Sequence, residues 1–396
     1  MSGFAIVTPY FGLWLVPKDR WPTQKPAIVF TIIYFAAVLF TRRNPSGLGT
    51  RASRRARYAA SIIFVVALIL GATSRLYLIE AWNPPRIDVP AITLAAVNVM
   101  RQMKNPYNAR FTELSCTALS TIRGQCRYGT VPVTEIFNYL PFTLLYYLPF
   151  VSFGLDIRYG NAVADILTAV GIFLIALKMQ RPVRGAFLSS LWSLSSLSII
   201  TTYYGNNHMV TTALLTLTVL ALVYRRYAIA GLFVGLASLT TQFGILALPF
   251  VLKYAFDVKK LKSVGITTAV VMISILAPFV VTAKNFLTNI LLFYTGTPIS
   301  QVLGIYFSSP EIFGVKATTI AGILLYIILF VHACLPKNIA DTDLGLLCSR
   351  IILATLVLAV LMAPFFVEVY LLPAAAMMLI YPLIQSNRAS NGPDSI

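Results

Sequence analysis

The sequence is poor in charged residues, and acidic residues are especially scarce. Of the 396 residues, 13 are Asp or Glu, 2 are His and 4 are Cys, whereas 58% are hydrophobic. This composition excludes an ordinary soluble domain and is typical of a polytopic membrane protein. No Cys and His residues stand at metal-ligand spacing. Because acids are so few, any acid at a membrane surface is a candidate for chemistry.

The apolar stretches predict membrane-spanning helices, so the expected fold class is all-α. They can cross a hydrocarbon core of about 30 Å, and they do not alternate as barrel strands would. Helices satisfy their own backbone hydrogen bonds, which lipid cannot do. The net charge of +18 does not indicate nucleic acid, because the basic residues cluster in short connections that meet anionic headgroups. The expected surroundings are therefore membrane lipids, with no nucleic acid partner.

The basic residues also predict the orientation of the chain. The positive-inside rule places the densest block, the arginines within residues 42–57, in the cytosol. Residues 58–78 then cross outward, and the loop 79–131 lies outside the cell. Basic turns that should lie inside follow at residues 178–184, 225–226, 253–262 and 337. The crossings between these anchors are residues 161–178, 185–203, 209–224, 263–282, 317–335, 344–363 and 366–385, with 227–252 leaving and returning as two short legs.

This count makes residues 1–396 a single transmembrane domain in the plasma membrane, with about ten to thirteen membrane segments. We expect the loop 79–131 to be an extracytoplasmic catalytic loop that carries membrane-surface helices. A second extracytoplasmic loop is expected at 284–316 and a cytosolic C-terminal tail at 385–396. The stretch 133–152 is interpreted as re-entrant or interfacial, because its prolines disrupt a regular helix.

Asp88 is the strongest candidate for a catalytic residue. It precedes apolar residues at helical spacing, which predict a helix lying flat on the membrane: Ala91, Leu94, Ala95, Val99 and Met103. An anion near the start of a helix is favoured by the helix dipole. The alternative is that Asp88 only caps this helix.

The same loop contains Cys116 and Cys126. If the loop is outside the cell, a disulfide between them is plausible, and two free thiols are the alternative.

Other polar residues also lie where a substrate could meet the membrane. The turn 203–208 is polar, compact and aromatic, so Asn206, Asn207 and His208 suit recognition of ligand hydroxyl groups, and an ordinary turn with interfacial tyrosines is the alternative. Glu368 and Tyr370 stand at the outer end of the last helix. They are candidates for contact with the substrate, and the alternative is that they make no such contact. Asp165 lies inside a predicted span, and its nearest basic partner in the sequence is Arg158.

Several short motifs together resemble a known family. Asp88 and its helix are followed by Asn105-Pro106-Tyr107 and then by Asn138-Tyr139-Leu140-Pro141. This order is similar to the first extracytoplasmic loop of the C-type (GT-C) membrane glycosyltransferases, in the bacterial and archaeal branch with mannosyl- and arabinosyltransferase-like members. The stretches 230–237, 246–250 and 368–373 are similar to later parts of that branch. Two departures stand out: the Gly position of the Pro-Tyr turn is Met103, and no Asp-x-Asp pair surrounds Asp88.

The resemblance implies inverting transfer of a hexose from a polyprenyl-phosphate donor to a lipid- or glycan-linked acceptor hydroxyl, with mannosyl transfer as the narrower expectation. Asp88 would be the base for that hydroxyl. The donor phosphate needs cations, for which the candidates are Arg86, Lys104, Arg110, Arg158 and Lys284. Asn105, Tyr107 and Tyr139 are the further substrate-binding candidates in the motifs. No cofactor is assigned, and a divalent cation such as Mg²⁺ or Mn²⁺, with Asp88 as ligand, is an open alternative.

Two other functions compete with this interpretation. A transporter or flippase for a lipid-linked precursor would favour ionisable residues near the midplane and two similar halves. The sequence has Asp165 as a midplane acid and no internal repeat. A non-catalytic relative within a glycan-assembly complex would keep the same fold without activity.

Overall fold

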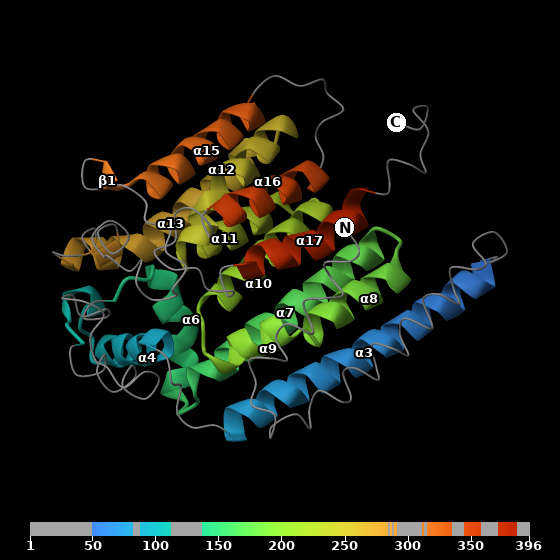
Figure 1. Ribbon diagram of the computed structural model, residues 1–396, viewed down its shortest axis with the longest axis horizontal. Coiled ribbons are helices and arrows are strands. Elements are labelled where there is room, and N and C mark those ends of the chain that lie inside the picture. The colour runs from blue at the N-terminus through green and yellow to red at the C-terminus, as the bar shows by residue number, and fades with distance from the viewer. Residues whose placement is uncertain are drawn as a thin grey trace.

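The computed structural model consists almost entirely of helices packed side by side (Figure 1). It describes residues 50–81, 88–111, 137–283, 286, 289–290, 311–312, 315–334, 344–357 and 371–385. The strands in this part of the chain, β1 (Glu311–Ile312) and β2 (Val315–Lys316), have two residues each and pair antiparallel. The all-α prediction is therefore confirmed.

The helices follow the predicted spans closely. Their bounds are α3 Thr50–Ala81, α4 Asp88–Arg101, η3 Pro106–Asn108, α6 Pro141–Ser152, α7 Ile157–Lys178, α8 Pro182–Ser193, α9 Ser196–Tyr203, α10 His208–Val223, α11 Tyr227–Ser238, α12 Gln242–Asp257, α13 Leu261–Thr282, α15 Ala317–Cys334, α16 Leu344–Val357 and α17 Leu372–Gln385. The two short legs expected within 227–252 correspond to α11 and α12. The stretch 185–203, which we expected to be one crossing, consists of α8 and α9, bent by 48° at their junction.

Three helical segments in the described part are long and apolar enough to cross a membrane: Arg55–Ala81, Ile157–Lys178 and Leu261–Thr282. The bent pair α8 and α9 would make a fourth span, and the other apolar helices are shorter. The predicted number of membrane segments remains a prediction.

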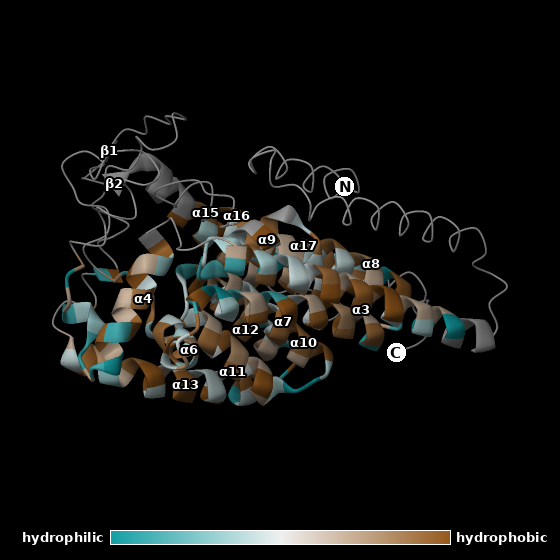
Figure 2. Cartoon of the chain, turned by 90° about the horizontal axis from the view of Figure 1, so that it is seen from below, coloured by the Kyte–Doolittle hydropathy of each residue, from teal (hydrophilic) through white to brown (hydrophobic). Residues whose placement is uncertain are grey.

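Large apolar side chains are exposed along α3, α13 and α15. Figure 2 shows that α3 and α13 consist mostly of hydrophobic residues. Ile62, Ile273 and Ile328 are each more than 60% exposed. A water-soluble protein would not leave such continuous apolar faces exposed, whereas lipid tails solvate them. Inside the bundle, small residues let the helices approach closely. A Cβ on Gly231 would lie 2.5 Å from the Val264 carbonyl oxygen, so α11 and α13 pack against each other here with almost no space between them.

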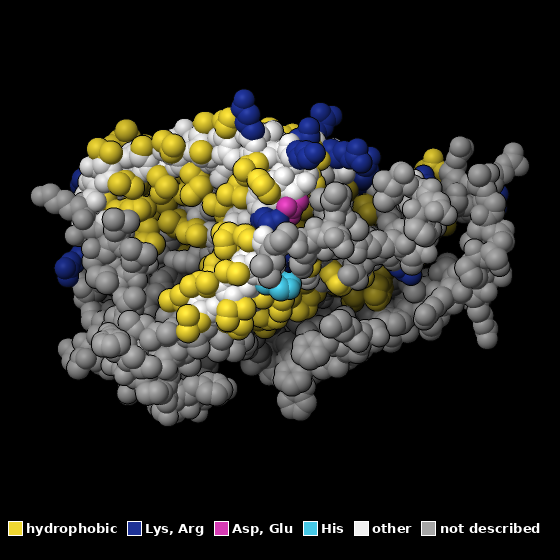
Figure 3. Space-filling view, turned by 90° about the horizontal axis from the view of Figure 1, so that it is seen from above, with side chains coloured by type: hydrophobic (Ala, Val, Ile, Leu, Met, Phe, Trp, Pro, Cys, Tyr) yellow, Lys and Arg dark blue, Asp and Glu magenta, His cyan; other side chains and the backbone are white. Residues whose placement is uncertain are grey.

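Basic turns gather at one end of the bundle, which we call the basic end. The Lys178 Nζ lies 5.3 Å from the centre of the Tyr224 ring, and the Lys260 Nζ lies 5.9 Å from that of Tyr227, so the turns after α7, α10 and α12 are neighbours. Figure 3 shows a group of Lys and Arg side chains at the upper edge of the molecule, with others dispersed over the same face. Each of these turns contains one residue with a left-handed backbone conformation, namely Gln180, Arg225 or Lys259. The N–H group of that residue donates to a carbonyl oxygen of the preceding helix and so closes the helix end.

The opposite end of the bundle, which we call the α4 end, contains α4, η3 and the start of α6 (Figure 1). Here the helical backbone is interrupted between α11 and α12, which leaves carbonyl oxygens at the end of α11 without helical hydrogen-bond donors. Two groups at the start of α6 supply partners: the Phe142 N–H donates to the Leu239 oxygen at 2.9 Å, and the Thr143 hydroxyl donates to the Thr240 oxygen at 2.8 Å. Such repair is required of a broken helix within a membrane fold, because lipid offers no hydrogen bonds.

Candidate functional site

Asp88 is the first residue of α4, at the α4 end. The helix buries Ile92, Ala96 and Val97 against the bundle. Of the stripe expected to rest on the membrane, Leu94 is 38% exposed, whereas Ala95 and Val99 pack against the core. Met103, which is 95% exposed, follows the helix. The structure thus fixes α4 to the bundle, and its contact with the membrane remains a prediction.

The turn after α4 contains Met103, which stands at the position where the resembled family has Gly. Met103 has a left-handed backbone with φ of 59°. The Met103 and Lys104 N–H groups close the helix by donating to the Met100 and Val99 carbonyl oxygens, at 2.9 and 3.2 Å. The turn therefore forms without Gly, at a strain cost of about 1 kcal/mol.

The Asn105-Pro106-Tyr107 motif holds the α4 end together. The Tyr107 hydroxyl donates to the Tyr139 carbonyl oxygen at 2.6 Å, and its ring packs edge-on against Phe137, Phe279 and Phe286. Burial raises the pKa of Tyr107 well above its ordinary value, which keeps this donor protonated.

Asn105 joins the same motif to α13. Its Oδ1 accepts from the Tyr107 N–H at 3.0 Å, and its Nδ2 donates to the Phe279 carbonyl oxygen at 3.1 Å and to the Thr282 hydroxyl at 2.6 Å. In this structure Asn105, Tyr107 and the Tyr139 backbone tie α4 to α13 and α6. Their predicted contact with substrate remains a prediction.

The turn 203–208 lies against the first turns of α4. A Cβ on Gly205, whose φ is 68°, would lie 2.9 Å from the Pro90 Cβ, and the Asn207 Nδ2 donates to the Thr93 hydroxyl at 3.1 Å. The Asn206 carbonyl oxygen accepts from the Asn161 Nδ2 at 3.0 Å, which joins the turn to α7. Two predicted site segments, Asp88 with its helix and the 206–208 turn, are thereby brought together.

The Asn207 side chain offers one polar atom for a further partner. Asn207 is fully buried, and its Oδ1 accepts no hydrogen bond, although its amide nitrogen is bonded to Thr93. A buried acceptor without a donor is unfavourable by about 1–3 kcal/mol. A ligand hydroxyl or a water molecule could supply the donor. His208 is also buried, with its ring edge-on to Phe243.

The predicted phosphate-binding residues lie in different environments. Lys104 and Arg110 are exposed at the α4 end. Arg158 differs from the expectation of an open cation: it is 1% exposed, its Nη2 lies 2.8 Å from the Asp156 Oδ2, and the same nitrogen donates to the Ile79 carbonyl oxygen. Its guanidinium thus links α7 to the end of α3. The other predicted site residues lie outside the described residues: Arg86, Lys284, Glu368, Tyr370, Cys116 and Cys126.

The prediction for Asp165 was wrong in its partner. Asp165 pairs with Arg75 of α3 and not with Arg158. Sequence reasoning missed Arg75, although it is a basic residue within an apolar run, which is the signal that could have found it.

No group of three or more His, Cys, Asp or Glu residues that could hold a metal ion occurs within the described ranges. A divalent cation therefore remains an open part of the prediction for Asp88, whose side chain lies outside what the structure describes.

No protein-family model matches the chain, and no curated protein matches it in sequence. Among solved structures, the chain is similar to ArnT from Cupriavidus metallidurans bound to undecaprenyl phosphate. The TM-score is 0.50 and the sequence identity is 13%, over 83% of this chain and 60% of that chain. The chain therefore has a helical fold similar to that of ArnT over the matched region. It thus spans about 60% of the length of ArnT, and the likeness concerns the fold alone.

Proposed function

We propose that the protein is a membrane glycosyltransferase that moves a hexose from a polyprenyl-phosphate donor to a lipid- or glycan-linked hydroxyl. The observation that carries the proposal is that the start of α4 and the 203–208 turn meet at one end of a GT-C-like fold. The ArnT structure with this fold contains undecaprenyl phosphate, which supports a polyprenyl-phosphate partner. Mannose is the sugar that the sequence resemblance favours.

The proposed chemistry is an inverting displacement. The acceptor oxygen attacks the anomeric carbon, the bond to the phosphate oxygen breaks, and the lipid phosphate leaves as an anion without needing an acid. A carboxylate in hydrogen-bond reach removes the acceptor proton, and we assign this role to Asp88. Lys104 and Arg110, both exposed at the α4 end, are suited to hold the donor phosphate. The buried Asn207 Oδ1 is suited to accept from a sugar hydroxyl.

The orientation inferred from the basic turns supports a reaction on the extracytoplasmic face. The basic end would lie in the cytosol and the α4 end outside. The protein would then be a multi-pass protein of the plasma membrane whose active face meets the outer leaflet.

The proposal is tested with purified protein reconstituted in lipid, radiolabelled polyprenyl-phosphate hexose and a membrane-lipid extract as acceptor. We expect the label to move into a new product, and an EDTA lane shows whether a divalent cation takes part. The second candidate function is a flippase, which the buried ion pair within the helices favours. Movement of intact donor across the bilayer without a labelled product would replace the enzyme by the flippase.

A further inference from the structure

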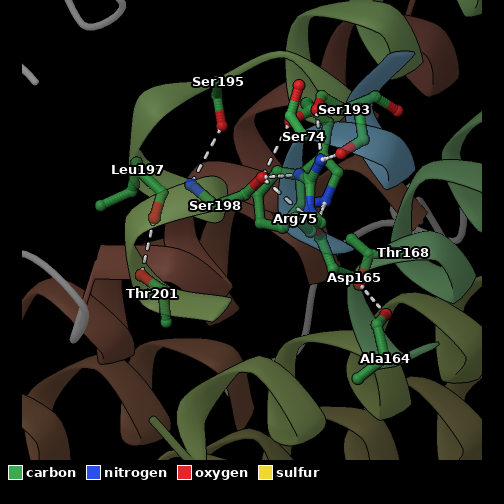
Figure 4. A network of polar contacts seen from close by, with 12 residues as sticks. Ser74, Arg75, Ala164, Asp165, Thr168, Ser193, Ser195, Leu197, Ser198 and Thr201 are labelled. Atoms are coloured by element: carbon green, nitrogen blue, oxygen red, sulfur yellow. Dashed lines mark hydrogen bonds and ion pairs between the residues drawn. The ribbon is translucent and has the colours of Figure 1, made fainter. Parts of the chain in front are cut away.

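A buried ion pair connects α3 and α7 inside the bundle (Figure 4). Both side chains, Arg75 and Asp165, are 2% exposed. The Asp165 carboxylate also accepts from the Trp192 Nε1 at 2.6 Å, and its Oδ2 lies 3.4 Å from the Ser198 hydroxyl oxygen. Four helices, α3, α7, α8 and α9, therefore meet at one carboxylate.

Arg75 also binds the backbone. Its Nη1 donates to the Gly71 carbonyl oxygen at 2.6 Å and to the Ser193 carbonyl oxygen at 2.8 Å, while its Nη2 donates to the Ser198 hydroxyl. A Cβ at position 71 would lie 2.5 Å from the Ser193 oxygen, so only Gly lets α3 come this close. The planar guanidinium reaches acceptors in several directions at once, which a single ammonium group cannot do.

These contacts lie at the break between α8 and α9. A bend of 48° separates the two helices, and carbonyl oxygens near it lose their helical donors. The Ser193 oxygen accepts from Arg75, and the Trp192 oxygen accepts from the Ser198 hydroxyl in addition to the Ser195 N–H, both at 3.1 Å. The Ser195 hydroxyl accepts from the Ser198 N–H at 3.2 Å and so caps the new helix. Arg75 of the ion pair and Ser198 thus supply hydrogen-bond donors to the backbone at the bend, which lipid cannot do.

The direction of α9 determines where the following turn lies. The Gly205 and Asn206 N–H groups close α9 by donating to the Thr202 and Thr201 oxygens, at 3.1 and 3.2 Å. The turn then meets α4 through Gly205 against Pro90 and through Asn207 bonded to Thr93. A continuous series of contacts therefore runs from the ion pair to the helix that begins at Asp88.

We propose that Arg75 and Asp165 are positioning residues, which fix the bend between α8 and α9 and thereby hold the 203–208 turn against the start of α4. Their effect on the turn comes through the carbonyl and hydroxyl groups of the break and not through contact with a ligand. This role is separate from general stabilisation, because it concerns one local geometry.

The test is hydrogen–deuterium exchange of the full-length protein in nanodiscs, comparing wild type with Arg75→Lys. Lys keeps the positive charge beside Asp165 and loses the fork that reaches Ser193 and Ser198 together. We expect amides of residues 194–204 to exchange about tenfold faster or more, with α11 and α12 unchanged. Arg350→Lys is the matched control, because Arg350 is a buried arginine on α16, and it should leave residues 194–204 unchanged.

Unchanged exchange at 194–204 in a folded Arg75→Lys protein would overturn the proposal, as would an equal rise in every helix. If Arg75→Lys does not fold, Ser198→Ala decides the question. It keeps the ion pair and removes the hydroxyl that joins the pair to the Trp192 oxygen. Faster exchange confined to 194–204 in that variant supports the proposal, and unchanged exchange contradicts it.

A second measurement rests on the transferase activity proposed above. Displacement of the 203–208 turn should raise KM for the substrate that Asn207 contacts, whereas a purely destabilising change lowers only the amount of active protein and leaves KM unchanged. An unchanged KM in Arg75→Lys would contradict positioning. If neither the wild-type protein nor any variant transfers sugar, the proposed transferase activity is wrong. The exchange measurement then still tests the positioning role of Arg75 and Asp165.

Discussion

Replacement of Asp88 by Asn should lower the rate of sugar transfer by about 10²–10⁴-fold, because the amide cannot take the proton of the acceptor hydroxyl. Helix α4 should persist, since Asn is as good as Asp at the start of a helix. The measurement is the initial rate with radiolabelled donor, together with a thermal melt in the same detergent. A lower rate in a protein with an unchanged melt assigns the loss to chemistry.

Asp257→Asn is the matched control for this prediction. Asp257 is at the basic end and pairs with Lys253 on the same helix, four residues away, so its removal should change stability by less than about 1 kcal/mol. The control should transfer sugar at the wild-type rate. Wild-type turnover by Asp88→Asn would move the base to another residue.

Replacement of Asp165 by Leu should lower the free energy of unfolding by about 3–5 kcal/mol, because it leaves the Arg75 guanidinium buried without a counter-charge. The double variant, Arg75→Met with Asp165→Leu, should recover most of this loss, since it removes both charges and keeps apolar volume. Denaturation by SDS of all three proteins, with wild type, measures the cycle.

The cycle separates an ion pair from two independent contacts. A double variant that is less stable than either single variant would contradict the account of a mutually dependent pair. A folded double variant is also useful for the positioning role, because it restores stability without restoring the hydrogen bonds of Arg75 to the break.

The positions of the helices could be predicted from the sequence, because long apolar runs and basic turns are local signals. The span expected at 263–282 corresponds to α13, and the legs expected within 227–252 correspond to α11 and α12. The bend between α8 and α9 was missed, since residues 185–203 contain no charged residue and no proline that would mark an interruption. The serines around it were the available sign, because their hydroxyls compete for backbone hydrogen bonds.

The contacts within the site could be predicted only in part. Asp88 was expected at the start of a helix, and α4 begins there. Hydrogen bonds between distant segments leave no spacing signal, which is why Arg75 with Asp165, 90 residues later in the chain, was missed. The sequence likewise gave no sign that Tyr107 donates to the Tyr139 carbonyl oxygen, because a backbone acceptor can belong to any residue.

A polyprenyl-phosphate lipid that binds at the α4 end should label that end when it contains a photoreactive group. The reconstituted protein is illuminated with a polyprenyl phosphate that has a diazirine beside the phosphate, and the labelled peptides are identified by mass spectrometry. We predict label in residues 88–111, 137–143, 203–208 or 239–243, competed away by unmodified polyprenyl phosphate. Label at the basic end, or spread without competition along the outward faces of α3, α13 and α15, would contradict the account.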